Sequence, residues 1–286
     1  MRILSFFVLF FCFGSAQSKQ PDPVVLIAGD VAQCDSPGTQ LTSHLIKALP
    51  YPVLAAGDLA YPNGTPEEFS RCYAPTWGIF KDRTFPVPGN HDYRTAGAAG
   101  YFGYFGDRAG DPAKGYYSFN LGQWHIVMLN SNRELEPGAH QLKWLAADLH
   151  QNTQQCVLAI WHHPRFSSGK HGNDARTQAL WETLYQHGVS VHVSAHDHDY
   201  ERFLPMNAAG ERDEAGGIRA FVAGTGGAKL YTLKERHPLS QVWQGENWGV
   251  LKLTLRPQGY DWEFLPVAGG SFQDAGSAQC VKRRKP

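Results

Sequence analysis

Residues 23–58 read "PVVLIAGDVAQCDSPGTQLTSHLIKALPYPVLAAGD", in which two apolar runs flank a longer, mostly polar segment. Each run is short and ends in Gly-Asp, as is typical of a buried strand. In the segment between them, Leu41, Leu45, Ile46 and Leu49 share one face of a helix. Two adjacent parallel strands need a crossover of this kind. The stretch therefore predicts a β-α-β unit within an α/β fold.

The same arrangement, an apolar run followed by acidic residues, asparagine or histidine, recurs further along the chain. It is found in "TFPVPGNHD" (84–92), "VLAIWHHP" (157–164) and "VSVHVSAHDHD" (189–199). Two amphipathic segments, 139–150 and 175–188, predict helices. Strands and helices are therefore expected to alternate up to about residue 199.

The last part of the chain has a different pattern, because helical spacing fades after residue 215. The segments 218–227, 248–257 and 259–267 alternate as antiparallel strands do, and a turn is expected between the last two. The sequence contains no linker or low-complexity tract that would separate two domains. We therefore expect an α/β fold in one domain: a four-layer α-β-β-α sandwich of two mixed sheets flanked by helices.

Charge and composition exclude some classes of partner. The chain has 286 residues, of which 26 are basic and 26 acidic, and 42% are hydrophobic. This balance leaves no electrostatic footprint for nucleic acid or for an anionic membrane, so we expect neither as a partner. A monomer is expected.

The first sixteen residues resemble a secretion signal. Arg2 precedes an apolar run from Ile3 to Phe13, and small residues follow up to Ala16. This pattern predicts a signal peptide over residues 1–16 that is cleaved to leave a single domain over residues 17–286. The mature protein is then expected to be secreted or periplasmic.

Cysteine usage agrees with export. Removal of the signal leaves four cysteines, an even number that allows three disulfide connectivities: Cys34, Cys72, Cys156 and Cys280. We favour Cys34 with Cys72 and Cys156 with Cys280. The alternative is that some of the four are free and buried.

The strand ends carry residues that suit metal binding. In open α/β sheets, ligands bind beyond the carboxyl ends of the strands. The candidates at those ends are Asp30, Asp58, Asn90, His162, His196 and His198. On an extended chain the side chains of His196 and His198 point the same way, so both are expected to face one place.

This set is larger than one cation needs, because a catalytic zinc usually takes three protein ligands. We therefore predict two metal ions that share a carboxylate and lie roughly 3.5 Å apart. Oxygen ligands mixed with imidazole suit iron, manganese or zinc better than calcium.

Five blocks of sequence together resemble the calcineurin-like metallophosphoesterases. They are "GD" (29–30), "GDLAY" (57–61), "GNHD" (89–92), "WHHP" (161–164) and "AHDHDYER" (195–202). Tyr61 and the final Tyr-Glu-Arg resemble the motifs of the purple acid phosphatase branch. The chain as a whole resembles the small, single-domain form of that branch. One departure is Ala195, where this branch usually has glycine; a methyl group is tolerated there unless the backbone needs a positive φ.

The resemblance implies a ligand set and a reaction. Asp30, Tyr61 and His198 correspond to the ligands of a ferric ion, and Asp58 to the bridging carboxylate. The ligands of a second, divalent ion (iron, zinc or manganese) correspond to Asn90, His162 and His196. The implied reaction is acid phosphatase-like hydrolysis of a small phosphorylated substrate, a phosphate monoester, by a metal-bound hydroxide. For Tyr61 the alternative is a buried tyrosine that packs over the sheet with its hydroxyl hydrogen-bonded.

Further residues are expected to act on the substrate. In the family the histidine at the position of His91 helps the leaving group depart, so His91 and Asp58 are the predicted catalytic residues. His163 and His171 are candidates for contact with the phosphate or the substrate rim, and the alternative for each is a loop histidine with an ordinary partner. We interpret Asp92, Asp197 and Asp199 as supporting groups that orient histidines.

Two other functions fit the same residues. A phosphodiesterase or nucleotide phosphohydrolase would use the same ligands, since substrate choice lies in loops such as 61–83 and 93–115. The other alternative is a catalytically inactive metal-binding protein.

Overall fold

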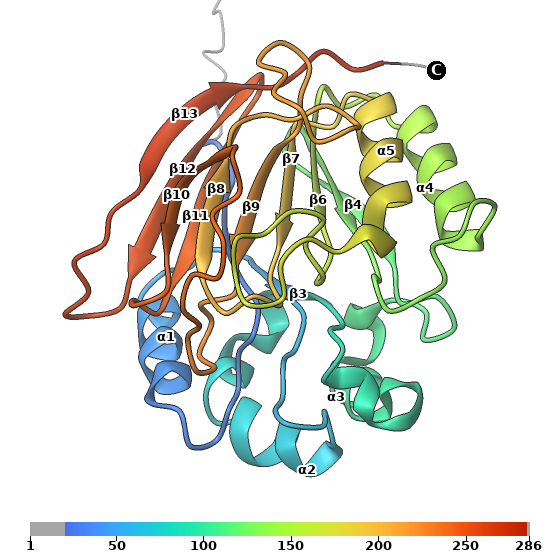
Figure 1. The fold of residues 1–286 in the computed structure, drawn as a ribbon. Coiled ribbons are helices and arrows are strands. Elements are labelled where there is room, and N and C mark those ends of the chain that lie inside the picture. Colours follow the sequence, from blue (N-terminus) through green and yellow to red (C-terminus); the bar gives the residue numbers. More distant parts are fainter. Residues whose placement is uncertain (1–20, 285–286) are drawn as a thin grey trace, which may run out of the picture.

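The computed structural model describes residues 21–284, so the predicted signal peptide lies outside the described residues. Its first sheet has six strands in the order β13-β12-β11-β1-β2-β3 (Figure 1). The three parallel strands of this sheet are β1 (Val24–Ala28), β2 (Val53–Ala56) and β3 (Thr84–Val87). Its antiparallel strands are β11 (Gly249–Arg256), β12 (Gly259–Pro266) and β13 (Ala275–Gln279).

The second sheet has seven strands in the order β10-β8-β9-β7-β6-β5-β4. Its parallel strands are β5 (Trp124–Met128), β6 (Cys156–Ile160), β7 (Val191–Ser194) and β9 (Arg219–Ala223). The strands that run antiparallel to their neighbours are β4 (Tyr117–Leu121), β8 (Tyr200–Phe203) and β10 (Ser240–Gln244). Both sheets are therefore mixed, as predicted.

Helices cover the outer faces of the two sheets. The α-helices are α1 (Pro37–Lys47), α2 (Pro66–Glu68), α3 (Ala99–Phe105), α4 (His140–Gln151) and α5 (Gln178–Gln186). Short 3₁₀ or π turns lie at Phe69–Tyr73, Trp77–Arg83, Asp92–Arg94, Ala96–Ala98, Gly106–Ala109 and Ala175–Thr177. None of the helices within residues 21–284 combines the length and the apolar character needed to cross a membrane.

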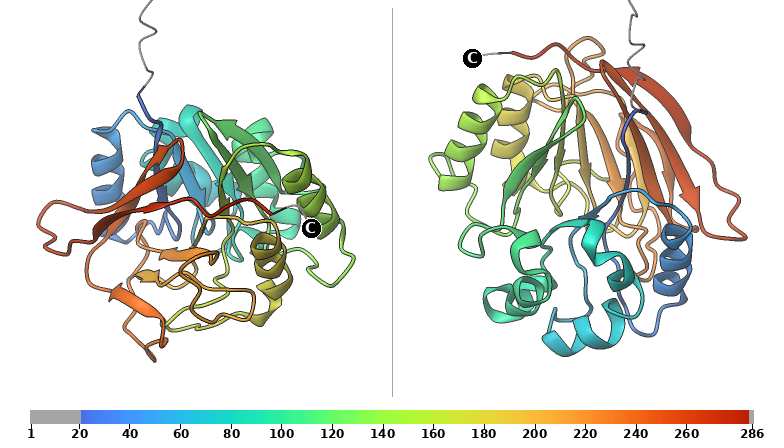
Figure 2. Two further views of the ribbon diagram at one scale, coloured as in Figure 1. Left: turned by 90° about the horizontal axis from the view of Figure 1, so that it is seen from above. Right: turned by 180° about the vertical axis from the view of Figure 1, so that it is seen from behind.

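Three buried clusters define the layers. The central cluster combines side chains from both sheets, for example Ile27 of β1 and Leu158 of β6. A second cluster joins the outer face of the first sheet to α1 and α3, and a third joins the outer face of the second sheet to α4 and α5 (Figures 1 and 2). The arrangement confirms the predicted four-layer α-β-β-α sandwich.

Local sequence explains where the first crossover helix begins. The Ser36 hydroxyl accepts a hydrogen bond from the Gly38 N–H at 3.2 Å, and Pro37 occupies the first turn. Helix α1 then joins the parallel strands β1 and β2, which confirms the predicted β-α-β unit. The predicted hairpin is also confirmed, since β11 and β12 pair antiparallel across residues 257–258.

Five strands point their carboxyl ends at the candidate ligands. Asp30, Asp58 and Asn90 follow β1, β2 and β3, and His162 and His196 follow β6 and β7. Because each group of strands is parallel, their polar ends gather at one edge of each sheet. Packing the sheets face to face then brings the two edges together.

Two disulfides cross-link the fold. Cys34 pairs with Cys72, and Cys156 pairs with Cys280, with Cα–Cα distances of 5.0 and 5.5 Å. The favoured connectivity is therefore confirmed, and the alternative of free cysteines is wrong. Cys156 begins β6 and Cys280 follows β13, so the second bridge ties one sheet to the other.

Two arginines of the basic segment at 282–285 form hydrogen bonds with the last turns of two helices. Arg283 donates to the Leu149 and His187 carbonyl oxygens, and Arg284 donates to the carbonyl oxygen of Tyr185. These carbonyls lie at the ends of α4 and α5, where cations are favoured by the helix dipole. Both arginines therefore take part in the packed structure.

A buried histidine predicts acid sensitivity. His192 on β7 stacks on Trp161 with ring centroids 3.6 Å apart, and burial lowers its pKa to about 3. The unfolded chain binds this proton near pH 6.5, so stability is lost as the pH falls from about 6.5 towards 3. Between pH 7 and pH 4.5 the wild type is expected to lose roughly 2–3 kcal/mol more unfolding free energy than His192→Leu. Denaturant unfolding at the two pH values measures this difference, and equal losses in both proteins would refute it.

Candidate metal centre

Three candidate ligands adopt a backbone conformation that is unusual for their residue types. Asp30, Asp58 and His196 have φ values of 57°, 52° and 69°. A left-handed residue other than glycine costs on the order of 1 kcal/mol or more, and such residues gather at functional sites. Ala195 does not have a positive φ, so its methyl group is compatible with the turn. Its Cβ instead packs where a side chain on Gly29 would lie, 2.5 Å away.

The two Ala-Gly-Asp strings continue to pair after their strands end. Asp30 N–H donates to the Gly57 carbonyl oxygen and Val31 N–H to that of Asp58, each at 2.9 Å. Gly89 lets the next loop approach closely, because a Cβ there would lie 2.1 Å from Asp58 Oδ1. The two aspartates are thus held side by side by backbone contacts.

The first group of donors surrounds the Tyr61 hydroxyl. This hydroxyl donates to Asp30 Oδ1 at 2.7 Å, and it lies 3.0 Å from His198 Nε2. His198 Nδ1 donates to the Lys229 carbonyl oxygen at 2.7 Å, so Nε2 is the nitrogen left facing the other donors. A backbone carbonyl that holds one ring nitrogen is the usual support of a metal-ligating histidine.

The second group surrounds His162. His162 Nδ1 donates to the Ala56 carbonyl oxygen at 2.9 Å, and Nε2 lies 3.2 Å from Asp58 Oδ2. One donor atom each from Asp30, Asp58 and His162 lies within 4.8 Å of the others, and the same holds for His162, His163 and His196. Asp58 Oδ2 is also 3.2 Å from the Tyr61 hydroxyl, so this oxygen belongs to both groups.

Two buried polar atoms without a hydrogen-bond partner indicate whether these donors fit metal ions. Among the described residues, Asn90 Oδ1 and His162 Nε2 are buried without a hydrogen-bond partner, and His162 Nε2 has only the close approach of Asp58 Oδ2 at 3.2 Å. A buried polar atom without a partner costs free energy, roughly 1–3 kcal/mol. A cation coordinated by both atoms removes that cost, and oxygen and imidazole donors suit iron, zinc or manganese. The residues present therefore fit a metal centre.

The electrostatics of the site also favour cations. Burial lowers the pKa of His162, but Asp58 and Asp30 outweigh it and raise this pKa to about 9. Burial raises the pKa of Asp58, and the facing His162 and His91 reverse the effect and hold it below its ordinary range. Two fully buried carboxylates therefore stabilise positive charge placed between them.

Tyr61 lies among the candidate ligands, and its hydroxyl is hydrogen-bonded there. Burial and the Asp30 and Asp58 carboxylates raise the pKa of its hydroxyl well above the ordinary value. As a neutral phenol it donates to Asp30. Ionisation would need a strongly Lewis-acidic cation beside the oxygen, and ferric iron is such a cation.

His91 faces the same centre from the rim. Its Nδ1 donates to the Pro62 carbonyl oxygen at 2.6 Å, and its Nε2 lies 3.9 Å from Asp58 Oδ2. The side chain is 19% exposed, unlike Asp58 at 1%. The ring can therefore meet both the centre and a molecule arriving from solvent.

His163 and His171 lie on the other side of His196. Their rings are centred 4.6 and 4.2 Å from the His196 ring. His163 is buried beside Ser131, whose hydroxyl accepts from the His163 backbone N–H and lies 2.8 Å from Nδ1. This geometry lets Ser131 donate to Nδ1 and leaves the His163 proton on Nε2, where it can be donated to an anion.

Two of the three supporting aspartates accept backbone N–H groups of the site loops. Asp92 accepts the N–H groups of Gly89 and Leu59 at 2.8 and 3.2 Å, and Asp197 accepts that of His171 at 2.7 Å. Asp92 and Asp197 thereby fix the loops from which His91 and His171 project, and Asp199 accepts the Trp243 indole N–H at 2.9 Å. Their role in orienting histidines stays a prediction.

Sequence reasoning missed Tyr231. Its ring stacks on His198 with centroids 4.0 Å apart and an angle of 7° between the planes. Its backbone N–H donates to the His198 carbonyl oxygen at 2.9 Å, and the nearby glycine-rich run 224–227 approaches the centre closely, since a Cβ on Gly224 would lie 2.7 Å from Asp30 Oδ2. That run was the available indication of a close backbone approach.

A cavity opens beside the centre. It measures about 620 Å³, and its lining includes Tyr61, His91, His198 and Tyr231. The remaining lining residues are Gln33, Cys34, Asp35, Pro62, Glu68, Arg71 and Lys229. A larger molecule than inorganic phosphate can therefore reach the donor groups.

Comparison with known proteins agrees with this geometry. A family model for calcineurin-like phosphoesterases matches residues 11–200. Purple acid phosphatase 15 of Arabidopsis thaliana is 29% identical over 225 residues, which cover 66% of this chain and 42% of that protein. The chain thus spans less than half the length of this relative.

Solved structures show the same fold. The purple acid phosphatase PPD1 from yellow lupin (Lupinus luteus) seeds matches with a TM-score of 0.71 at 20% identity, covering 91% of this chain and 54% of that one. GAP50, described as the anchor in the inner membrane complex of Plasmodium, matches with a TM-score of 0.71 at 14% identity. That match covers 93% of this chain and 91% of GAP50.

Proposed function

This chain belongs to the calcineurin-like phosphoesterase family, and from that premise we propose that it is a dinuclear-metal phosphatase that hydrolyses phosphate monoesters. One observation carries the proposal. Asp58 Oδ2 lies 3.2 Å from both the Tyr61 hydroxyl and His162 Nε2, so one carboxylate oxygen joins the two donor groups. A shared carboxylate is what a pair of closely spaced cations requires.

The proposed ligands divide between two ions. Asp30, Tyr61 and His198 hold a ferric ion, and Asp58 bridges. A divalent iron, zinc or manganese ion is held by Asn90, His162 and His196, and the orphaned Asn90 and His162 atoms support this assignment. When bound, the two ions neutralise phosphoryl oxygens and activate a water for attack on phosphorus.

The surrounding residues are proposed to position the substrate. His163 and His171 bind phosphoryl oxygens from the side of His196, and the buried His163 is the better anchored of the two. His91 lies on the opposite side, beside Tyr61. From there His91 donates a proton to the departing oxygen, a general-acid role that histidine fills more often than other residues.

Export is part of the proposal. Two disulfides are supporting evidence, because such bonds persist in oxidising compartments outside the cytosol. The hydrophobic start of the chain is proposed to be the cleaved signal, with one catalytic domain following it.

Activity on matched aryl esters tests the proposal. The metal-loaded protein is expected to hydrolyse an aryl phosphate monoester at least about tenfold faster than the corresponding diester, because a dianionic phosphoryl group can meet both cations. Exhaustive chelation is expected to abolish turnover, and restored metal to recover it.

The outcomes separate the alternatives. Faster turnover of the diester would favour the phosphodiesterase. Absence of turnover of either ester by protein that contains two ions per chain would favour the inactive metal-binding protein.

A further inference from the structure

We propose that the cavity beside the metal centre binds a second phosphate group, so that preferred substrates carry at least two phosphates. The inference rests on the proposed function and names its substrate class. The cavity extends from Tyr61, His91 and His198 to two cationic side chains, Arg71 and Lys229. The cavity measures about 620 Å³. A substrate with one phosphoryl group at the metal centre therefore leaves much of the cavity volume for its remaining atoms.

The two cations are available for an anion. Arg71 and Lys229 are exposed, and within residues 21–284 neither side chain forms an ion pair or a hydrogen bond. Arginine matches two phosphate oxygens with its planar fork, and lysine adds a point charge. Cations that line a cavity without partners are therefore suited to a phosphate group.

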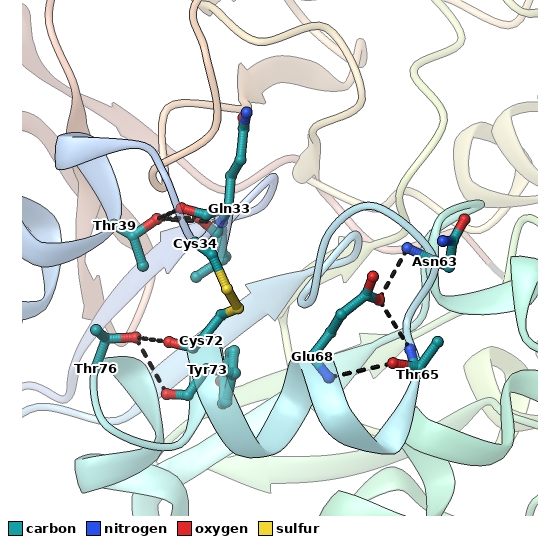
Figure 3. Close-up of a disulfide and its surroundings, with 10 residues drawn as sticks. Gln33, Cys34, Thr39, Asn63, Thr65, Glu68, Cys72, Tyr73 and Thr76 are labelled. Carbon is teal, nitrogen blue, oxygen red and sulfur yellow. Dashed lines mark hydrogen bonds between the residues drawn. A yellow bond between two sulfur atoms is a disulfide. The ribbon is translucent and has the colours of Figure 1, made fainter.

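The lining also contains two acidic residues, and one of them is already engaged by backbone groups. Glu68 Oε2 accepts the backbone N–H groups of Asn63 and Thr65, at 2.9 and 3.0 Å, and so is committed to the start of α2 (Figure 3). Outside the metal centre, the lining contains one more acidic residue, Asp35, together with the cations Arg71 and Lys229. Formal charges in the lining outside the metal centre therefore balance, and Arg71 and Lys229 remain available to an anion.

A neighbouring cavity is lined by further lysines. It measures about 560 Å³, shares Lys229 and Tyr231 with the first cavity, and adds Lys170 and Lys234. Its lining contains no acidic residue. An anionic group that extends from the metal centre past Tyr231 therefore meets further lysines.

The structure anchors the backbone next to the two cations, which come from segments far apart in the sequence. Arg71 lies in the turn after α2, next to Cys72, and the disulfide ties this turn to Cys34 in the loop after β1 (Figure 3). Beside Cys34, the Gln33 Oε1 atom accepts the Lys229 backbone N–H at 3.1 Å. Pre-organisation of this kind lowers the entropic cost of binding.

A charge-neutral double variant tests the inference. The kcat/KM of a hexose bisphosphate is compared with that of the monophosphate of the same sugar, in the wild type and in Arg71→Gln/Lys229→Gln. The wild type is expected to prefer the bisphosphate by about tenfold or more, and the double variant to lose that preference, since each cation contributes charge-assisted contacts. Lys143→Gln, an exposed lysine on α4, is the matched control and should keep the preference.

The possible failures are distinguishable. A wild type that turns over both sugars equally, or a preference that survives in the double variant, contradicts this inference and leaves the phosphatase intact. Absence of turnover of any phosphate ester by the metal-loaded protein contradicts the proposed function and, with it, this inference.

Discussion

Asp58→Asn is expected to lower kcat on an aryl phosphate monoester by on the order of 10³-fold or more, equivalent to about 4 kcal/mol of transition-state stabilisation. The amide keeps the shape of the side chain but removes the charge that two cations share. Asp58 Oδ2 is the oxygen common to both donor groups, so no neighbouring carboxylate can replace it without moving. The variant is also expected to retain fewer than two metal ions per chain.

The fold should survive this substitution. In the metal-free protein the Asp58 carboxylate faces His162 and His91, so the metal-free variant loses this pairing and should unfold at a lower denaturant concentration than the metal-free wild type. Asp274→Asn is the matched control, because Asp274 is also buried but pairs with Arg202 away from the centre. It should lose stability and keep both ions. Activity within tenfold of wild type in Asp58→Asn would contradict the bridging role.

His91→Ala is expected to lower kcat by about 10²–10⁴-fold on an alkyl phosphate, the usual contribution of a general acid. The effect should be much smaller on nitrophenyl phosphate, whose leaving group departs as a stable anion without a proton. The reason is positional: Nδ1 is held by Pro62, and Nε2 is left facing Asp58 and the cavity.

The two substrates make this result specific. His150→Ala, an exposed histidine on α4, is the control and should change neither rate. Equal losses on both substrates in His91→Ala would show that His91 positions the phosphoryl group rather than protonating the leaving oxygen.

The fold could be predicted from the sequence because burial and strand direction dictate it. Apolar runs closed by polar residues identify the parallel strands, and their direction places Asp30, Asp58 and Asn90 at one edge of a sheet. The four-layer arrangement and both disulfides were predicted correctly. The family resemblance contributed Tyr61, which strand patterns alone do not single out.

The local geometry of the histidines could not be predicted in this way. Alternation along an extended strand predicted that His196 and His198 face one place, but β7 ends at Ser194 and His196 has a φ of 69°. The extended backbone expected there is wrong. His196 instead lies near His163, and His198 near Tyr61, because the turn separates the two rings.

Contacts between segments that are distant in the sequence could not be predicted from sequence patterns either. Tyr231 stacks on His198, and Arg71 and Lys229 share a cavity, although these residues are far apart in the chain. Such neighbours are set by how loops from different strands pack. A single sequence carries no periodic signal for that packing.

Metal quantification combined with visible absorption decides whether the centre holds two metal ions and whether one of them is iron. We expect two metal ions per purified, active chain, at least one of them iron, and a tyrosinate-to-iron absorption band that Tyr61→Phe removes. A colourless protein that holds zinc or manganese alone would contradict the iron assignment. Full phosphatase activity with one ion or none per chain would contradict the dinuclear centre itself.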